Sequence, residues 1–341
     1  MMLRRTLAML VALLETCSAL HTLSADRTAP PDGAVIVRGS GTQAGEFSTI
    51  QAAVTSLPAD TSAQVIFVYP GTYREQVHIT RTGNLTMMGY TTDAHSYAAN
   101  TVRLAFNLSQ GQVGGGDLAA TLRIDKNNFA LYNIDVVNDF GPHTASGAQA
   151  LAVAGYGTNL GFYAVGFYGY QDTLRAEKGV QFYGLCYVEG AVDYIFGQHG
   201  HAFFHRNVIA SVDAGAITAD GPDTAADSLF VINESNITTS VAATTDLTSL
   251  VFLGRPWSDH AQVAYISCSL GALINPAGWE PWSVSSPQTD AVFFAEYANT
   301  GPGAVGPRAS FSTQLGSAAG YGIADVLGAN WMDWVDETYF T

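Results

Sequence analysis

The sequence predicts an all-β, single-domain fold of the parallel β-helix type, in which short strands stack as the coils of a solenoid. Short strand-like runs broken by Gly, Asn and Asp recur along the chain, and Phe162, Phe182 and Phe204 mark a ragged period between them. Only 13% of the 341 residues are charged, whereas 48% are hydrophobic and 11% aromatic. Such a composition suits apolar and aromatic ladders inside coils about 4.8 Å apart.

An antiparallel sandwich is the alternative that the strand-like runs leave open. A sandwich would favour regular two-residue hairpin turns, but few Asn-Gly or Asp-Gly pairs separate the runs. The ragged period therefore favours the solenoid. No linker rich in Pro or Ser divides the chain, so we expect one domain.

The N-terminus has the pattern of a secretory signal peptide over residues 1–19. Arg4 and Arg5 provide the positive charge, residues 6–14 form a short apolar core, and small residues allow cleavage after Ala19. A buried first helix is the alternative. The apolar core is too short for a membrane span, which needs about 20 residues. We therefore expect a secreted, extracellular protein without a membrane partner, whose catalytic domain comprises residues 20–341.

Beyond one short helix near residues 50–57, the elements that we expect are strands. The clearest runs are Leu131–Ile134, Phe162–Val165, Phe182–Leu185 and Phe204–Val208, with later strands around Val231 and Tyr265. Cleavage of the signal peptide would leave two cysteines, Cys186 and Cys268. They could form one disulfide, but we favour small buried thiols in strands.

The charge balance excludes some classes of partner. The net charge is −15, and the chain has only two lysines, Lys126 and Lys178. Without a basic stripe, the protein is not expected to bind nucleic acid or anionic membrane surfaces. Four N-x-Ser/Thr sequons are compatible with a secreted glycoprotein. They begin at Asn84, Asn107, Asn233 and Asn236.

Common catalytic and metal motifs are missing. The sequence has no G-x-S-x-G elbow and no glycine-rich nucleotide loop. His199, His201 and His205 form the one cluster that resembles a metal site, but no nearby Cys, Asp or Glu completes a ligand set. We expect no metal and no cofactor.

A group of amides and carboxylates follows the period of the coils. Gln149, Gln171 and Asp193 are equally spaced at that period, and Asp172 directly follows Gln171. In a solenoid these side chains would converge on one patch of surface. Like-charged carboxylates side by side favour a proton on one of them, which acid/base chemistry requires. A structural amide ladder with solvated aspartates explains the spacing equally well.

The sequence motifs around these residues support the catalytic alternative. Eight motifs occur in order over roughly residues 35–335. Through them the sequence resembles the pectin methylesterase (pectinesterase) family, in its secreted, microbial, fungal-like form. The motifs are Phe47-Ser-Thr-Ile-Gln-Ala-Ala-Val54, Gly71-Thr-Tyr-Arg-Glu75, Gly147-Ala-Gln-Ala-Leu-Ala152, Gln171-Asp-Thr-Leu174, Asp193-Tyr-Ile-Phe-Gly197, Leu253-Gly-Arg-Pro-Trp257, Glu296-Tyr-Ala-Asn-Thr-Gly-Pro-Gly303 and Asn330-Trp331.

The resemblance implies a right-handed, pectin-lyase-like β-helix that removes methyl esters from galacturonate units of pectin and releases methanol. It implies that Asp193 is the nucleophile, that Asp172 is the acid and then the base, and that Arg255 holds Asp193. Gln149 and Gln171 would form the oxyanion hole. The substrate-binding residues that it implies are Trp257, Tyr194 and Phe196.

Two positions depart from the family pattern. Tyr194 stands where many members have Phe, and Arg175 stands where relatives often carry Tyr, which puts one sugar contact in doubt. The implied partner is methyl-esterified homogalacturonan, bound by a monomer. In the implied mechanism Asp193 attacks as a carboxylate, and Arg255 should lower its pKa by favouring the charged form.

Two other functions remain as alternatives. A pectate lyase or polygalacturonase on the same fold would need an acidic Ca²⁺ cluster or an added acid/base set, and no adjacent Asp-Asp pair occurs in the chain. A non-catalytic glycan-binding solenoid is disfavoured because every catalytic residue that the resemblance implies is present.

Overall fold

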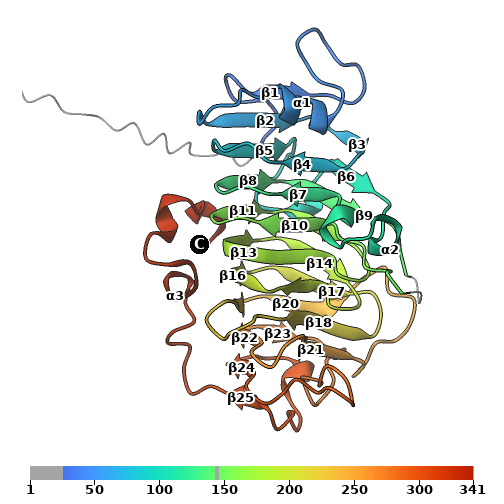
Figure 1. Ribbon diagram of the computed structural model, residues 1–341, viewed down its shortest axis with the longest axis vertical. Helices are drawn as coiled ribbons and strands as arrows, with labels where there is room; N and C mark the ends of the chain where they lie inside the picture. Colours follow the sequence, from blue (N-terminus) through green and yellow to red (C-terminus); the bar gives the residue numbers. More distant parts are fainter. Residues whose placement is uncertain (1–25, 143–145, 341) are drawn as a thin grey trace, which may run out of the picture.

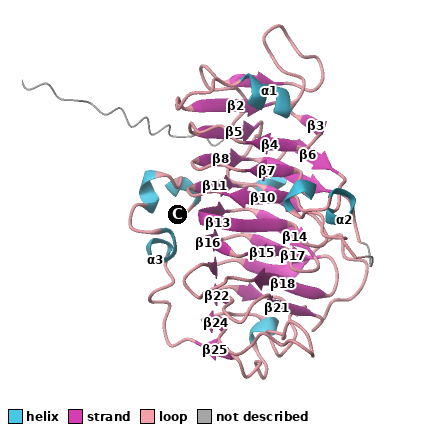
Figure 2. Ribbon diagram, viewed as in Figure 1, coloured by secondary structure: helices cyan, strands magenta, loops and turns pink. Residues whose placement is uncertain are grey.

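The structure is a computed structural model that describes residues 26–142 and 146–340. Short strands run across the long axis of the molecule and stack in coils from one end to the other (Figures 1 and 2). Each named strand pair in the described residues is parallel. The prediction of a single parallel β-helix is therefore confirmed, and the antiparallel sandwich is wrong.

The strands form two sheets, which each coil visits in turn. The eight-stranded sheet contains β3 (Gly71–Arg74), β6 (Val102–Phe106), β9 (Ile134–Asn138), β12 (Gly166–Tyr168), β14 (Tyr187–Gly190), β17 (Val208–Ser211), β20 (Asn236–Thr239) and β23 (Ser269–Leu270). The 17-stranded sheet bends around the rest of the coil. It contains β1 (Val35–Val37), β2 (Gln64–Val68), β4 (Val77–Ile79), β5 (Leu85–Gly89), β7 (Leu122–Ile124), β8 (Phe129–Tyr132), β10 (Val153–Tyr156), β11 (Leu160–Tyr163), β13 (Leu174–Gly184), β15 (Ile195–Gly197), β16 (His199–His205), β18 (Gly215–Asp220), β19 (Leu229–Asn233), β21 (Val251–Pro256), β22 (Gln262–Ile266), β24 (Phe293–Tyr297) and β25 (Ser312–Gln314).

Helices are short and lie outside the coils. The α-helices are α1 (Ile50–Ser56), α2 (Gln110–Val113) and α3 (Ile323–Leu327), and 3₁₀ turns cover Tyr97–Ala99, Asp117–Ala119, Pro302–Ala304, Trp331–Asp333 and Glu337–Tyr339. The helix predicted near residues 50–57 is confirmed as α1. Its first turn is capped by Glu75, whose carboxylate accepts the Ile50 and Gln51 N–H groups at 2.8 and 2.9 Å.

An aromatic stack runs through the interior of the central coils. The rings of Phe162 and Tyr183 are 4.8 Å apart, and those of Tyr183 and Phe204 are 4.4 Å apart, both nearly parallel. The sequence period placed Phe182 in this column, which is wrong by one position. Phe182 points to the opposite face of its strand, where it pairs in register with Phe203. A slip of one position reverses the face of every side chain in a strand.

Left-handed residues turn the chain from the long sheet into the eight-stranded sheet. Asn133, Ala164, Leu185 and Arg206 have φ between 49° and 54°, and each follows a strand of the long sheet. Of the strand-like runs read from the sequence, Leu131–Ile134 and Phe204–Val208 cross a corner into a second strand, whereas Phe162–Val165 and Phe182–Leu185 end before the next strand begins. Residues other than Gly adopt this backbone region rarely, so stacking between coils stabilises the corners.

Two predictions about the cysteines and the N-terminus have different outcomes. Cys186 and Cys268 are both buried free thiols, as favoured, although each lies just outside a strand and donates to backbone carbonyls. The signal peptide predicted for residues 1–19 lies outside the described residues. Within residues 26–142 and 146–340, no helix is long and apolar enough to cross a membrane.

The C-terminal segment covers one side of the coil stack. Helix α3 packs against β13 and β16, and the segment continues along the same side (Figure 1). Tyr339 is buried there and accepts a hydrogen bond from Arg27 at 2.7 Å, which ties the two ends of the described chain together. This packing closes one outer face of the long sheet, whereas the face built from β10, β15, β18 and β21 carries the polar groups described next.

Candidate active site

The predicted amides and carboxylates lie in successive turns that lead from the eight-stranded sheet into the long sheet. Gln171 and Asp172 connect β12 to β13, Asp193 connects β14 to β15, and Gln149 precedes β10. The turns are hydrogen-bonded to one another. Ala150 N–H donates to the Gln171 carbonyl at 3.1 Å, and Asp172 N–H donates to the Val192 carbonyl at 3.0 Å. The structure therefore brings these four predicted residues onto adjacent coils, in the order that their spacing implied.

The backbones of both aspartates are in the left-handed region. Asp172 has φ of 62° and Asp193 has φ of 50°. Asp enters this region more easily than most residues, yet such conformations cost free energy and concentrate at functional sites. Like the other left-handed residues, both aspartates form corners of the coils, and these two corners carry carboxyl groups on adjacent coils.

Arg255 on β21 donates two parallel hydrogen bonds to the Asp193 carboxylate. Its Nε lies 2.8 Å from Oδ1 and its Nη2 lies 2.7 Å from Oδ2. Asp193 is 5% exposed, so water screens this pair weakly. The guanidinium also lies over the Trp282 ring, 4.5 Å from its centroid. One face of Arg255 is thus held by an aromatic ring while its edge fixes the carboxylate.

The two carboxyl groups have different electrostatic surroundings. Burial raises the pKa of Asp193, and Arg255 opposes this rise through hydrogen bonds and charge. Arg255 therefore acts on the pKa of Asp193 in the predicted, lowering direction, but burial outweighs it and the pKa stays above its usual value. Burial, and then the negative charge of Asp193, raise the pKa of Asp172 well above its usual value, against Arg175 and Arg255. A pair driven apart in this way suits one ionised and one protonated role.

The two glutamine side chains are free for a ligand. In the part of the chain that the structure describes, neither Gln149 nor Gln171 has a side-chain hydrogen bond, and Gln149 Oε1 is buried without a partner. Buried amides normally find partners, so unpartnered ones need an explanation. A reacting carbonyl oxygen beside them would accept hydrogen bonds from their NH₂ groups, whereas Gln149 Oε1 is itself an acceptor and is not satisfied by such an oxygen.

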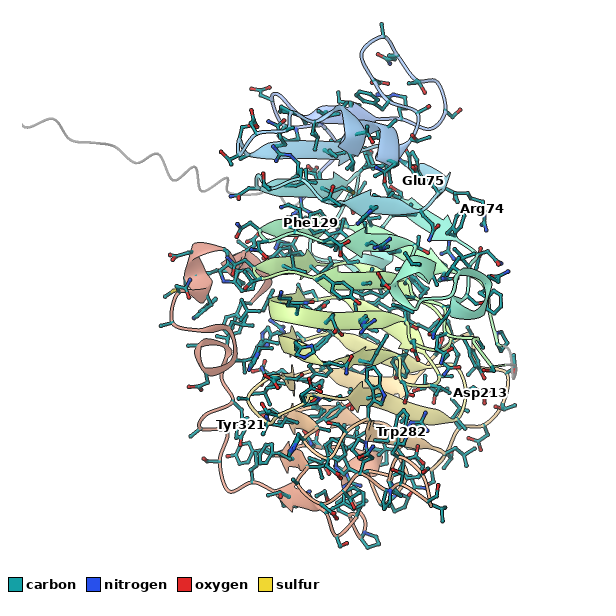
Figure 3. The ribbon with its side chains drawn as sticks, in the orientation of Figure 1. Arg74, Glu75, Phe129, Asp213, Trp282 and Tyr321 are labelled. Carbon is teal, nitrogen blue, oxygen red and sulfur yellow. The ribbon has the colours of Figure 1, made fainter. Side chains whose placement is uncertain are left out.

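Aromatic side chains cover the coils beside the carboxylates. Phe196 and Trp257 were predicted here, and their rings lie 6.3 Å apart. Tyr156 and Trp282 are partly buried against the same cluster and were not predicted. Figure 3 shows Trp282 over the strands of this face. The contact of Phe196 and Trp257 with a substrate stays a prediction.

The structure contradicts the prediction that Tyr194 binds the substrate. Its side chain is 0% exposed and points into the coil interior, where its hydroxyl lies 3.0 Å from Ser211 Oγ. It cannot contact a substrate. Asp193 forms a left-handed corner before β15, where side chains do not alternate, and Tyr194 and Ile195 both point into the core.

Arg175 occupies the middle of an outward-facing column. Ala154, Arg175, Phe196, Ala219 and Arg255 pair in register across neighbouring strands. Arg175 Nε donates to Glu177 Oε2 at 2.8 Å. The positive charge of Arg175 acts on Asp172, a role that the sequence did not suggest. The register itself was the available signal, since Arg175 precedes Phe196 by one coil.

The three histidines do not form a metal site. His199 lies 3.5 Å from Glu177 Oε1, whereas His205 is buried at the other end of β16 and lies 2.9 Å from the Phe340 carbonyl. At about 3.3 Å per residue, a strand separates these two positions far beyond a shared coordination sphere. Among the described residues, no group of three or more His, Cys, Asp or Glu side chains could hold one ion.

Known proteins resemble this chain over nearly its whole length. Residues 34–313 match the Pectinesterase family. A pectinesterase of Aspergillus niger is 42% identical over 94% of this chain and 96% of its own, and one of Aspergillus aculeatus is 40% identical over 94% and 97%. The solved pectin methylesterase from Aspergillus niger superposes with a TM-score of 0.84 at 39% identity, covering 92% of this chain and 100% of that one. A pectin methylesterase solved in complex with a hexasaccharide gives 0.74 at 26% identity, covering 88% and 98%. With these matches and the parallel β-helix, the chain belongs to the pectinesterase family.

Proposed function

We propose that this protein hydrolyses the methyl esters of galacturonate units in pectin and releases methanol. The observation that carries this proposal is the pairing of Asp193, fixed by both nitrogens of Arg255, with Asp172, whose pKa is raised further. The curated relatives that cover nearly the whole chain are named pectinesterases. No cofactor is needed for the chemistry that these side chains can perform.

The first half of the reaction forms an acyl-enzyme. A carboxylate oxygen of Asp193 attacks the ester carbonyl carbon, and the carbonyl electrons move to its oxygen. The Gln149 and Gln171 NH₂ groups donate to that oxyanion. As the tetrahedral intermediate collapses, the bond to the methoxy oxygen breaks and the proton of Asp172 passes to it, so methanol leaves.

The second half restores both carboxyl groups. Asp172, now a carboxylate, takes a proton from water while the water oxygen bonds to the acyl carbon. The bond to Asp193 breaks and its carboxylate returns to Arg255. The product acid then loses its proton to solvent, so one ester and one water yield methanol, a galacturonate carboxylate and a proton.

Methanol release from pectin tests this proposal. We expect Asp193→Asn and Asp172→Asn each to lower the rate by at least about a thousandfold, because each lacks a group that makes or breaks a bond. Asp246→Asn is the matched control, since Asp246 only accepts hydrogen bonds from Thr248 in an exposed turn. Activity of either active-site variant near that of Asp246→Asn would contradict the mechanism.

The same assay separates the depolymerase alternative. A lyase or polygalacturonase would shorten the pectin chain, and a lyase would also create unsaturated ends that absorb ultraviolet light. We expect methanol without a fall in chain length, with or without a chelator. Chain shortening without methanol would replace the esterase proposal with a depolymerase.

We also propose that the protein is a secreted, monomeric glycoprotein. The exposed sequon residues Asn84, Asn107 and Asn236 are the accessible acceptors. Asn233 is partly buried, and its side-chain nitrogen lies 2.9 Å from His205 Nδ1. Glycopeptide mass spectrometry of the secreted protein should find glycans at the exposed positions and none at Asn233.

A further inference from the structure

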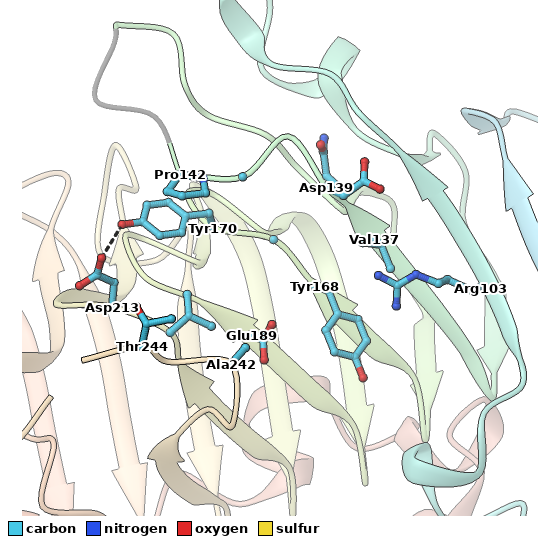
Figure 4. Close-up of a pocket in the computed structure, with 14 residues that line it drawn as sticks. Arg103, Val137, Asp139, Pro142, Tyr168, Tyr170, Glu189, Asp213, Ala242 and Thr244 are labelled. Atoms are coloured by element: carbon cyan, nitrogen blue, oxygen red, sulfur yellow. Dashed lines mark hydrogen bonds between the residues drawn. The ribbon is translucent and has the colours of Figure 1, made fainter. Parts of the chain in front are cut away.

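A second cavity lies on the outer face of the eight-stranded sheet, across the connecting turns from the candidate active site. It has a volume of about 410 Å³, within the usual range for small-ligand sites. Its floor comes from β9, β12 and β14, and its rim from described residues just after β9, β12, β17 and β20 (Figure 4). Tyr170 lines this cavity, and its chain neighbour Gln171 belongs to the candidate active site. The two sites are therefore separated by a single turn of chain.

The cavity combines an aromatic ring with hydrogen-bonding groups. The Tyr168 ring lies on its floor, packed against the Tyr187 ring with centroids 5.2 Å apart, and the Arg103 guanidinium lies over it, 5.6 Å from its centre (Figure 4). In the described part of the chain, Arg103 makes no side-chain hydrogen bond. Its donors can therefore reach a ligand that packs against the outer edge of the ring.

Carboxylate oxygens supply acceptors around the ring. Glu189 Oε2 accepts the hydroxyls of Tyr187 and Ser240, both at 2.6 Å, which leaves Oε1 available. At the rim, Asp213 Oδ2 accepts the Tyr170 hydroxyl at 3.0 Å (Figure 4). Carboxylates accept hydrogen bonds strongly from hydroxyl groups, whereas they repel other carboxylates.

The charge of the lining selects against anions. Asp139, Glu189 and Asp213 line the cavity with Arg103 as the one cationic residue among them. Asp139 is neutralised by a bidentate pair with Arg74, at 2.9 and 3.1 Å. The remaining balance is one positive against two negative groups. An aromatic edge among hydrogen-bonding groups, with excess negative charge, suits an uncharged, hydroxyl-rich sugar and disfavours a uronate anion.

We propose that this cavity is a second carbohydrate-binding site, which takes methyl-esterified galacturonate units and rejects the demethylated product. The identity of the sugar rests on the proposed function. The outer edge of the Tyr168 ring packs against one sugar, Arg103 donates to its oxygens, and Glu189 and Asp213 accept from its hydroxyls. Two sites on one protein retain a long esterified chain more strongly than one site, because the second contact is intramolecular.

Titration calorimetry with a fully methyl-esterified trigalacturonate tests the second site. The protein carries Asp193→Asn, so that the ester survives the measurement. We expect two binding sites per chain in this background and one after Tyr168→Ala is added. Tyr168→Phe keeps the ring and is the matched control, since the Tyr168 hydroxyl has no hydrogen bond in the described structure; two sites should remain. One site in all three proteins would overturn the proposal.

A second variant tests selectivity and does not depend on removal of the ring. Asp213→Asn keeps an acceptor for Tyr170 but removes one negative charge. Asp213→Asn is added to the Asp193→Asn protein. We expect the second site to bind the demethylated trimer about tenfold more tightly with Asp213→Asn than without it, which corresponds to about 1.4 kcal/mol. Unchanged rejection of the demethylated trimer would contradict the assigned charge selectivity.

Kinetics with the otherwise native enzyme distinguish this proposal from the proposed function. Tyr168→Ala should raise KM for long pectin by about tenfold more than it raises KM for the trimer, because only the long chain can reach both sites. An equal change for both substrates would overturn the second site while methanol release continued. Absence of methanol release by the wild-type enzyme would instead contradict the esterase proposal.

Discussion

At the residue scale, Arg255 opposes the cost of burying Asp193. Burial raises the pKa of this carboxyl group, and the two hydrogen bonds from Arg255 favour its ionised form. Attack on an ester needs that ionised form. The geometry of the guanidinium matters as well as its charge, because a planar fork meets both carboxylate oxygens at once. A lysine at this position would supply the charge without the fork.

We expect Arg255→Lys to lower kcat by roughly a hundredfold and to move the acidic limb of the pH–rate profile to higher pH. One of two hydrogen bonds to Asp193 is lost, so the burial effect is less well opposed and the pKa of Asp193 rises further. A larger part of the enzyme is then protonated and inactive at low pH. Methanol release measured across pH checks both effects.

Arg38→Lys is the matched control for this substitution. Arg38 also makes a bidentate pair, with Glu46 at 2.8 and 3.0 Å, but near the first coil rather than at the active site. It should leave the pH profile unchanged. If both variants behaved alike, the effect of Arg255→Lys would be one of general stability and not of the nucleophile.

Arg175 affects the pKa of Asp172, the proposed general acid. Its positive charge lowers the pKa of Asp172 against the larger effects of burial and Asp193. In Arg175→Gln the pKa of Asp172 rises further, so the protonated acid persists to higher pH. The alkaline limb of kcat/KM should therefore move to higher pH, as measured with a soluble ester.

Arg123→Gln provides the comparison for that shift. Arg123 lies in the same outward-facing column but pairs with Asp117 at 3.2 Å and with Asp125 at 3.4 Å, away from Asp172. It should leave the alkaline limb in place. A shift toward lower pH in Arg175→Gln would contradict the role assigned to Arg175.

At the element scale, the stacked aromatic side chains join neighbouring coils. Phe204 is 0% exposed and stacks on Tyr183. We expect Phe204→Ala to lower the free energy of unfolding by about 3–5 kcal/mol, because it removes the stack and leaves a cavity. Phe204→Leu should cost less, since it fills most of the space. Denaturant unfolding gives both values, and equal costs would show that the column of rings contributes little.

The coil period explains why the sequence predicted so much of the fold and of the site. Gln149, Gln171 and Asp193 are spaced by the length of a coil, so a correct period places them together without any knowledge of the turns. The period is less reliable for the direction of a side chain. Phe162 pairs with Tyr183 and Tyr183 with Phe204 in an unbroken register, so Phe182, one position earlier, falls on the opposite face. Tyr194, which the resemblance implied as a substrate contact, lies inside the coil.

The rest of the site comes from segments whose position no period determines. Trp282 lies in the long loop between β23 and β24, and its approach to Arg255 depends on how that loop folds back. Tyr156 ends β10, where the pairing with β13 shifts register beside Gly155. The cavity around Tyr168 similarly needs the relative position of several loops. Such contacts follow from tertiary packing, which local sequence patterns do not contain.

At the scale of the whole molecule, the net charge opposes retention of the product. The chain carries −15, and each proposed turnover converts an uncharged ester into an anion on the substrate. The arginines closest to the reacting ester are already paired, Arg255 with Asp193 and Arg175 with Glu177. The field that a demethylated chain meets is therefore dominated by the negative charge of the protein.

We therefore expect demethylated oligogalacturonate to be a weak product inhibitor whose inhibition strengthens as salt is added. Raising the ionic strength from about 0.01 M to about 0.1 M shortens the Debye length from about 30 to about 10 Å, which screens the repulsion between two polyanions. Inhibition constants measured over this range at constant pH should fall, whereas KM for the uncharged methyl-esterified trimer should stay nearly constant and serves as the control. Lowering the pH should act in the same direction as salt, because protonation removes charge from both partners. Tight binding of the demethylated oligomer at low salt, weakened by added salt, would mean that the paired arginines attract the product and that the overall charge does not govern its release.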